Sequence, residues 1–511
     1  MKNVDFLKEL NIVQLIKIKE NSWNGRDFIN LESYLTDDID VINYRLDALA
    51  DLMENRSLYE AMQEIVPQID SFRELRSLSS TSNNEIDDLY SIRDLQLYLD
   101  LADYLFNKLN SFQLKSKLFL TLRNEINAIC RSKEYETIKN CLPENAKLIQ
   151  SVQSVTVGVN LDPALHPVEA GIVTVNDQKY VSGNIIDKLL RADMQPDSFQ
   201  CAAPLTIPAL IMSQEEKERM EHAINSALHK ILRSSLRSWK PAVKAYSNAK
   251  INFLISYYSD LRFLIAAAGF FYRLKAKNYP VCRPKAFPME EKRCLIRQTY
   301  NPEFVLQSHH MTLNDVRFDE NVGIYIFTGA NGGGKTLFTK ALAVCQALFQ
   351  LGLYIPAEYG ELSPCTELLL HFPQRDGTLT KSRFTDECER MSNVMKTADR
   401  YSMIFCDEAF SGTGNREAAA IASEVIKAMS AKGCRGIFIT HIHELSSLPE
   451  EINAFDGCVS RLDNLTVTVD EQTGKRLYKI VRCSPDKTSR AGDIAKRYGL
   501  DYNSLIAQSA K

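Results

Sequence analysis

The chain has 511 residues, of which 45% are hydrophobic and 24% are charged, and its formal net charge is −3. So many residues exceed what one hydrophobic core usually serves, which predicts several domains. The small negative charge excludes a globally basic nucleic-acid-binding protein, so any such site has to be a local patch.

The cysteines and apolar segments predict a cytoplasmic protein with no membrane partner. The 12 cysteines are spread singly and form no Cys-x-x-Cys pair, which favours reduced thiols over a disulfide framework or a zinc site. The amino terminus carries no signal-peptide pattern. The longest apolar stretch, near residues 263–272, is too short to cross a bilayer.

In chain order, apolar residues at helical spacing predict helices over most of residues 1–150, with a loop at the Ser/Asn-rich segment 77–84. The alternation of Val155, Val157 and Val159 and the stretch 172–175 then predict strands. A helical pattern returns over residues 215–277, interrupted at Pro241.

Prolines 280, 284 and 288 mark a boundary, after which strands and helices alternate. We therefore predict a multi-domain protein. A largely α-helical region, residues 1–290 with a small β-containing insert at about 150–212, is followed by an α/β domain at residues 291–511.

Residues 324–336 read Ile-Tyr-Ile-Phe-Thr-Gly-Ala-Asn-Gly-Gly-Gly-Lys-Thr, a strand leading into the phosphate-loop pattern G-x-x-x-x-G-K-[ST]. Such a loop points backbone N–H groups and a helix amino terminus at a phosphate. We expect it to bind a nucleoside triphosphate; the alternative is a Gly-rich turn that binds nothing. The expected contact residues are Gly329, Ala330, Asn331, Gly332, Gly333, Gly334, Lys335 and Thr336, with the Thr336 hydroxyl also a Mg²⁺ ligand.

Residues 403–408 place two carboxylates after four apolar strand residues. We expect Asp407 to hold Mg²⁺ and Glu408 to polarise the attacking water. The alternative is a pair of solvated acids. His441 follows another apolar strand and is a candidate sensor of the γ-phosphate or water, although a packed or surface histidine is the alternative.

Over roughly residues 295–505 the chain resembles the ATPase module of the MutS family of ABC-type ATPases. The family's loop typically reads Thr-Gly-Pro-Asn-Met-Gly-Gly-Lys-Ser, and residues 328–336 here read Thr-Gly-Ala-Asn-Gly-Gly-Gly-Lys-Thr. Further motifs resemble the family's at residues 353–357 (Leu-Tyr-Ile-Pro-Ala), 382–384 (Ser-Arg-Phe) with Glu387, 440–445 (Thr-His-Ile-His-Glu-Leu), 478–479 (Tyr-Lys) and 495–500.

Upstream the resemblance is weaker. Residues 44–49 and 257–283 are similar to the start and return of the MutS lever, and the β insert stands where MutS inserts a DNA clamp. No counterpart of the mismatch-reading domain is expected. The Phe-rich segment 269–272 imitates the reader's Phe-x-Glu element, but we expect it to pack in a helix. The family's Gly-Arg-Gly-Thr is Phe-Ser-Gly-Thr at residues 410–413, and no nuclease-like extension is expected after residue 511.

The resemblance implies an ATPase that uses ATP and Mg²⁺ and forms a homodimer through the ATPase domains, with a carboxy-terminal helical dimerisation element. One subunit would supply Lys335, Glu408 and His441 as catalytic residues, and the other would present Ser382 in trans to the γ-phosphate. Met311 is the candidate adenine shelf, with Asn314 beside it; a simple loop residue is the alternative.

The leading hypothesis is an ATP-dependent clamp on branched or duplex DNA, without mismatch reading, that works with repair proteins. The alternative is a nucleotide-gated module acting on a protein or ribosome partner. A structural-maintenance-type ATPase lacks support, because the sequence has no long heptad arms. The candidate DNA-contacting cations, for which a solvated helix face is the alternative, are Lys230, Arg233, Arg237, Lys240 and Lys244.

Overall fold

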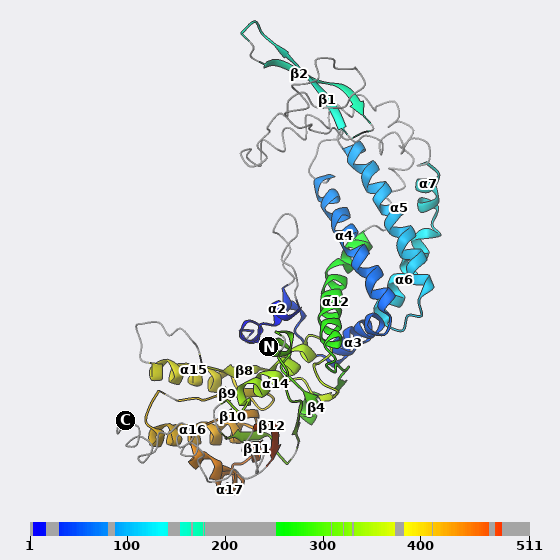
Figure 1. Ribbon diagram of the computed structural model, residues 1–511. Coiled ribbons are helices and arrows are strands. Elements are labelled where there is room, and N and C mark those ends of the chain that lie inside the picture. The colour runs from blue at the N-terminus through cyan, green and yellow to red at the C-terminus, as the bar shows by residue number, and fades with distance from the viewer. Residues whose placement is uncertain are drawn as a thin grey trace, which may run out of the picture. The chain divides into compact units, whose positions relative to one another are not determined.

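A computed structural model of the chain describes residues 4–16, 30–79, 87–141, 154–164, 167–176, 178, 252–307, 309–319, 321–329, 332–373, 383–410, 412–469 and 476–482. These residues combine helices with sheets, as predicted (Figure 1). They divide into two compact units: unit 1 takes its residues from 1–59, 115–118 and 262–511, and unit 2 from 60–114 and 119–261.

Unit 2 contains α5 (Asp87–Ser111) and α7 (Lys133–Cys141) completely. It also contains α4 (Arg56–Ser79) and α6 (Lys117–Cys130) except for their first residues. Their apolar sides form a core in which Phe72, Leu105 and Phe119 are fully buried. The prediction of a loop at residues 77–84 is wrong at its start, because α4 continues to Ser79. The preceding turns are packed, with Ile69 and Phe72 buried, and the helix continues from them through Ser77 to Ser79.

The predicted strands of the β insert are present in unit 2 as an antiparallel hairpin of β1 (Ser154–Leu161) and β2 (Pro167–Asn176). Two register shifts interrupt the pairing. Its apolar side chains are largely exposed, among them Leu161 (51%) and Val173 (65%). The predicted DNA-contacting cations between residues 230 and 244 lie outside the described residues, as does the segment 495–500.

Unit 1 begins with the short helices α1 (Phe6–Glu9), α2 (Ile12–Ile16) and η1 (Leu31–Tyr34), followed by α3 (Ile39–Glu54). It also takes the carboxy-terminal part of α12 (Asn252–Ala276). Phe270 and Phe271 of α12 are completely buried, which confirms that the Phe-rich segment packs in a helix. Over the described part of the chain, no helix is both long and apolar enough to cross a membrane.

The centre of unit 1 is a six-stranded sheet with the order β12-β11-β6-β10-β9-β8. The strands β6, β9 and β10 are short, mostly apolar and buried throughout, which is typical of a parallel sheet. Only β12 runs antiparallel, against β11. The strand bounds are β6 (Ile324–Phe327), β8 (Leu368–His371), β9 (Met403–Asp407), β10 (Arg435–Ile439), β11 (Leu462–Val469) and β12 (Arg476–Arg482).

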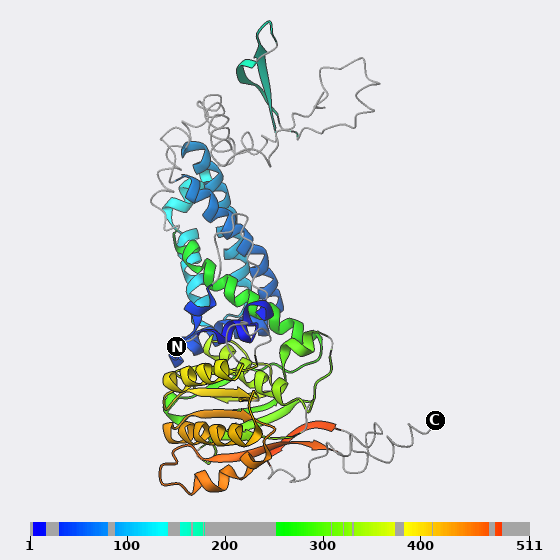
Figure 2. The ribbon, with the colours of Figure 1, turned by 90° about the vertical axis from the view of Figure 1, so that its left-hand side faces the viewer.

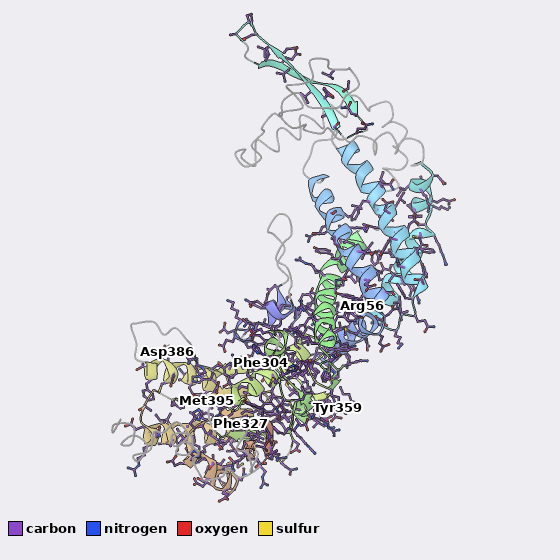
Figure 3. The ribbon with its side chains drawn as sticks, viewed as in Figure 1. Arg56, Phe304, Phe327, Tyr359, Asp386 and Met395 are labelled. Carbon is purple, nitrogen blue, oxygen red and sulfur yellow. The ribbon has the colours of Figure 1, made fainter. Side chains whose placement is uncertain are left out.

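Helices cover both faces of this sheet (Figure 2). On one face, Ile326, Ile404 and Phe438 share a core with α15 (Arg383–Thr397), α16 (Asn415–Lys432), η3 (His443–Ser447) and α17 (Leu448–Asn453). On the other, Phe327 (labelled in Figure 3) meets Phe338 of α14 (Lys335–Gln350), with ring centroids 6.1 Å apart. Since α14 is apolar nearly all round, it has to be buried on most of its surface.

A four-stranded sheet with the order β3-β7-β4-β5 packs on α14. Along the chain, the short helix α13 connects strands β4 and β5. A buried contact of 3.4 Å between Thr299 Oγ1 of β4 and Cys345 Sγ of α14 joins the sheet to the helix. The bounds are β3 (Lys285–Ala286), η2 (Met289–Glu291), β4 (Cys294–Thr299), α13 (Pro302–Leu306), β5 (Asn314–Phe318) and β7 (Tyr359–Leu362).

Gly436 in β10 leaves no room for a side chain, since a Cβ there would lie 1.8 Å from the Ile404 carbonyl oxygen. Gly436→Ala is expected to destabilise the protein by more than about 3 kcal/mol, because the paired strands have to move apart. Thermal unfolding followed by circular dichroism measures this loss. Gly171→Ala is the matched control, since a Cβ at that strand glycine meets nothing within 4 Å. Equal midpoints for the two variants would contradict the prediction.

Candidate functional site

The phosphate-loop segment connects the end of β6 to the start of α14. Its glycines have φ angles of 134° at Gly329, 73° at Gly332 and 84° at Gly334, in the region that side chains disfavour. Gly334 is the N-cap residue, so α14 begins directly at Lys335. The backbone N–H groups of the first helical turn are therefore available to a bound anion.

Lys335 lies across the mouth of this loop. Its side chain is buried, with a relative exposure of 4%, and its Nζ donates a hydrogen bond of 2.6 Å to the Gly329 carbonyl. A short loop with an ammonium folded over it matches the site expected for a phosphate chain. A phosphate oxygen at this place would be a stronger acceptor for Lys335 than the carbonyl.

Thr336 and Asp407 meet although 71 residues separate them. Thr336 Oγ1 donates a hydrogen bond of 2.8 Å to Asp407 Oδ2. Asp407 is buried, and within the described residues its Oδ1 has no hydrogen-bond partner. Burial raises the pKa of Asp407 and the Thr336 hydrogen bond opposes the rise. A hydroxyl and a carboxylate oxygen short of a partner are the oxygen ligands that Mg²⁺ prefers, so these residues fit the ion.

Glu408 and His441 form a second pair at the same edge of the sheet. Nε2 of His441 lies 2.5 Å from Glu408 Oε1, and both side chains are accessible, with relative exposures of 35% and 37%. The backbone of Glu408 has a φ of 51°, which is unfavourable for a residue with a side chain and is typical of functional sites. The Glu408 N–H is held by the Ile439 carbonyl at 3.1 Å.

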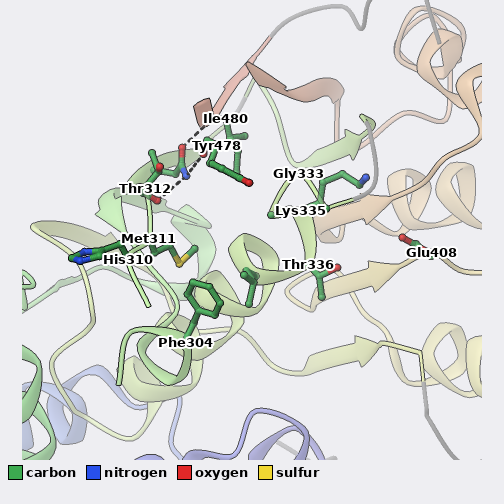
Figure 4. A pocket seen from close by; sticks show the side chains of 14 residues that line it. Phe304, His310, Met311, Thr312, Gly333, Lys335, Thr336, Glu408, Tyr478 and Ile480 are labelled. Atoms are coloured by element: carbon green, nitrogen blue, oxygen red, sulfur yellow. Dashed lines mark hydrogen bonds between the residues drawn. The ribbon is translucent and has the colours of Figure 1, made fainter. Parts of the chain in front are cut away.

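A cavity of about 480 Å³ opens beside the loop and extends to a wall that the motifs did not reveal (Figure 4). The predicted residues Met311, Lys335, Thr336 and Glu408 line it. Sequence reasoning missed other lining residues because they belong to separate segments; these are Phe304, His310, Thr312, Tyr478 and Ile480. Tyr478 belongs to the Tyr-Lys motif that was noted in the sequence, but the motif did not indicate that this side chain lines a cavity.

Asn314, which was expected beside Met311, lines the cavity and bonds to the backbone. Its side-chain amide donates to the carbonyl of Tyr478 at 3.0 Å, and its oxygen accepts from the N–H of Ile480 at 2.8 Å. The side chain thus bonds to the backbone of β12 and joins the two sheets of unit 1. These contacts hold Asn314 in the cavity wall.

Three predicted contact residues lie outside the described residues: Ala330, Asn331 and Ser382. The residue that follows Ser382 is described, because α15 begins at Arg383. A Cβ on Gly412, which follows the acidic pair, would lie 3.3 Å from the backbone nitrogen of Phe384. The glycine thus lets the segment after Glu408 approach the start of α15.

The electrostatics of Asp407 generate a prediction about stability. The pKa of Asp407 is raised in the folded state, so the folded protein binds the proton more tightly than the unfolded chain does. The contribution of this carboxyl to the free energy of unfolding is therefore highest at low pH, where the group is protonated, and it falls as pH rises through the raised pKa. Asp407→Asn is expected to raise the unfolding midpoint of the nucleotide-free protein at neutral pH, with a gain that shrinks as pH falls. Calorimetry across a pH series checks this. Asp456→Asn, at an exposed carboxylate, is the control; a lower midpoint for Asp407→Asn at neutral pH would refute the electrostatic interpretation.

Two family models match the sequence. The model of MutS domain V matches residues 325–506, which contain the loop, the acidic pair and His441. The model of the MutS2 N-terminal domain matches residues 37–277. The matches agree with the resemblance seen in the motifs, and they cover both the helical region and the site.

Curated proteins give the same result at low identity. The chain is 30% identical over 230 residues to a DNA mismatch repair protein MutS of Lactobacillus delbrueckii subsp. bulgaricus, covering 44% of this chain and 26% of the relative. It is 28% identical over 244 residues to an Endonuclease MutS2 of Lactiplantibacillus plantarum, covering 47% and 28%. It is 27% identical over 308 residues to an Endonuclease MutS2 of Ligilactobacillus salivarius, covering 59% and 36%.

The chain thus aligns with well under half the length of each of these relatives. Its own sequence, however, is matched over most of its length by the two family models. The sequence thus matches two domains described for the MutS family, one over residues 37–277 and the other over residues 325–506.

Proposed function

We propose that the chain is an ATPase that binds ATP with Mg²⁺ and hydrolyses it to ADP and phosphate. The observation that carries this proposal is the meeting of two side-chain pairs at one sheet edge. The Thr336 hydroxyl lies 2.8 Å from the Asp407 carboxylate, and His441 Nε2 lies 2.5 Å from the Glu408 carboxylate. The loop and Lys335 lie directly beside both pairs.

In this proposal the triphosphate lies on the loop and the nucleoside extends into the cavity. Lys335 exchanges its hydrogen bond with the Gly329 carbonyl for the β- and γ-phosphates, and the amino terminus of α14 adds its free N–H groups. Phe304 and Met311 offer an aromatic ring and a polarisable sulfur to the adenine. The volume of about 480 Å³ is within the usual range of small-molecule sites.

Thr336 and Asp407 would hold Mg²⁺, which supplies positive charge to the β- and γ-phosphate oxygens as the bond breaks. Glu408 then polarises a water molecule that attacks the γ-phosphorus, while the bond from that phosphorus to the bridging oxygen breaks. The proton of the water passes to the Glu408 carboxylate. His441 donates to this carboxylate from Nε2 and holds it in position.

We further propose that two copies form a homodimer through their ATPase domains, residues 291–511. The start of α15, which follows Ser382, would face the γ-phosphate of the partner copy, because a helix amino terminus offers N–H donors and partial positive charge. Hydrolysis would remove part of this bridge. The helical region, residues 1–290, would then act as a lever with its β insert at about 150–212 as the clamp-like part.

The names of the relatives support DNA as the partner, so we propose that the chain acts on branched or duplex DNA in repair, without reading base mismatches. One observation favours the second candidate, a module acting on a protein or ribosome. The described residues of the hairpin, 154–164 and 167–176, contain no lysine or arginine, and four of their six valines are exposed. Such a surface offers no cation to a phosphate backbone.

The two partners are separable by salt dependence. Binding of duplex and four-way-junction DNA, with and without ATP, is expected to weaken steeply as salt rises if phosphate contacts dominate. Fluorescence anisotropy at several ionic strengths measures the slope. If neither DNA binds at low salt while ATP turnover is intact, the proposed ATPase stands, DNA is excluded as its partner, and the second candidate is favoured.

Substitution of Glu408 tests the hydrolytic role. Glu408→Gln keeps the size of the side chain, so ATP binding is expected to persist while turnover falls by about 10² or more, the usual contribution of a general base. The ATP-bound dimer should then accumulate in sedimentation velocity. Steady-state phosphate release and calorimetric titration with ATP separate the two effects. Turnover at the parent's rate would show that another group orients the water.

Lys335→Ala serves as the contrasting variant. Loss of the buried ammonium removes the charge that the phosphates require, so both ATP binding and turnover are expected to be lost. Unchanged thermal unfolding of the nucleotide-free variant would show that the fold is intact. Retention of ATP affinity by Lys335→Ala would contradict the proposed phosphate site.

A further inference from the structure

The amino-terminal residues 4–16 lie outside both segments matched by the family models. They form α1 and α2, and most of the apolar side chains in residues 4–16 are buried: Phe6 and Leu10 have exposures of 2% and 3%, and Ile12 is completely buried. Helix α1 packs against β8, the edge strand of the six-stranded sheet. The segment is therefore an integral part of unit 1.

Asn11 connects α1 to α2 and makes one contact far along the chain. Its backbone φ is 53°, a left-handed conformation that asparagine tolerates better than most residues. Its Nδ2 donates a hydrogen bond of 2.9 Å to Oε1 of Glu303 in α13.

Helix α13 forms the wall of the cavity. It has only 5 residues, too few to be stable without neighbours. Phe304, the residue next to Glu303, lines the cavity (Figure 4). The N-cap residue Asn301 accepts from the Phe304 N–H at 3.1 Å, and its own N–H contacts the sulfur of Met311 at 3.2 Å. Whatever holds α13 thus sets the positions of Phe304 and Met311 together.

We propose that Asn11 is a positioning residue for the nucleoside end of the cavity. It acts through Glu303, whose carboxylate it holds, and so fixes the aromatic and sulfur wall against which a base would lie. This inference rests on the proposed ATP site and adds to it a residue from a distant part of the chain.

The anchorage of the segment on both sides of Asn11 supports this role. On the carboxy-terminal side, the guanidinium of Arg273 donates to the Leu15 carbonyl. On the amino-terminal side, α1 packs against β8 and Phe6 is buried. Because both flanks are fixed, the Asn11 amide presents a defined donor to Glu303 rather than a mobile one.

The test is Asn11→Gly, which keeps the left-handed backbone and removes only the side chain. We expect ATP affinity to weaken about tenfold, the value of one hydrogen bond to a charged group, and kcat at saturating ATP to be unchanged. Inorganic tripolyphosphate, used as a competitive inhibitor, should keep its inhibition constant because it does not reach the wall. Calorimetry with ATP and the steady-state assay supply both readouts.

Two further variants exclude a general loss of structure. Glu303→Ala should reproduce the effect, and combining it with Asn11→Gly should add nothing, since both remove one interaction. Asn110→Ala, which removes an interhelical hydrogen bond of 2.8 Å to Asn127 in unit 2, should leave ATP affinity unchanged.

Unchanged ATP affinity in Asn11→Gly, or an equal weakening of ATP and tripolyphosphate, would overturn the positioning role. A parent protein that binds no ATP would instead overturn the proposed function. The two failures are therefore distinguishable.

Discussion

Strand β10 pairs in parallel with β6 on one side and with β9 on the other, and this pairing places Phe327, Ile439 and Asp407 side by side. In a parallel sheet the carboxyl ends of neighbouring strands share one edge. The loop after β6, the acidic pair at the end of β9 and His441 after β10 consequently converge. Gly436 is part of this constraint, since its missing side chain allows β10 to approach Ile404 closely.

The convergence carries an electrostatic cost. Asp407 is taken out of water beside a second carboxylate, Glu408, and both effects raise its pKa. The Thr336 hydroxyl and Lys335 compensate only in part. A buried carboxylate whose charge is only partly compensated gains most when a cation binds beside it. Local strain at Glu408 belongs to the same arrangement.

The cavity wall depends on a second set of contacts, which come from segments without phosphate-loop motifs. Asn314 ties the four-stranded sheet to β12 through the backbone of Tyr478 and Ile480. Helix α13 adds Phe304 and is held in turn from residues 4–16. The wall beside the loop is therefore assembled from three parts of the chain, and it responds to changes in any of them.

The position of the loop between β6 and α14 followed from the sequence, because Gly329, Lys335 and Thr336 belong to one short segment with a fixed spacing. The alternation of strands and helices after residue 300 and the strands near residue 155 were also predictable, since they depend on periodicity over a few residues. The continuation of α4 to Ser79 was not predictable, because packing of the preceding turns outweighed the loop-like composition.

Other features needed the tertiary structure. Three such features join segments that are distant in the sequence. Asn314 bonds to the backbone of β12, and Phe304 and Tyr478 line one cavity. Asn11 contacts Glu303, which is 292 residues away. No local spacing encodes them, because long-range contacts are selected by how whole elements pack. The sequence determined which side chains are suited to phosphate chemistry, and the packing of the sheets and helices decided which other residues surround them.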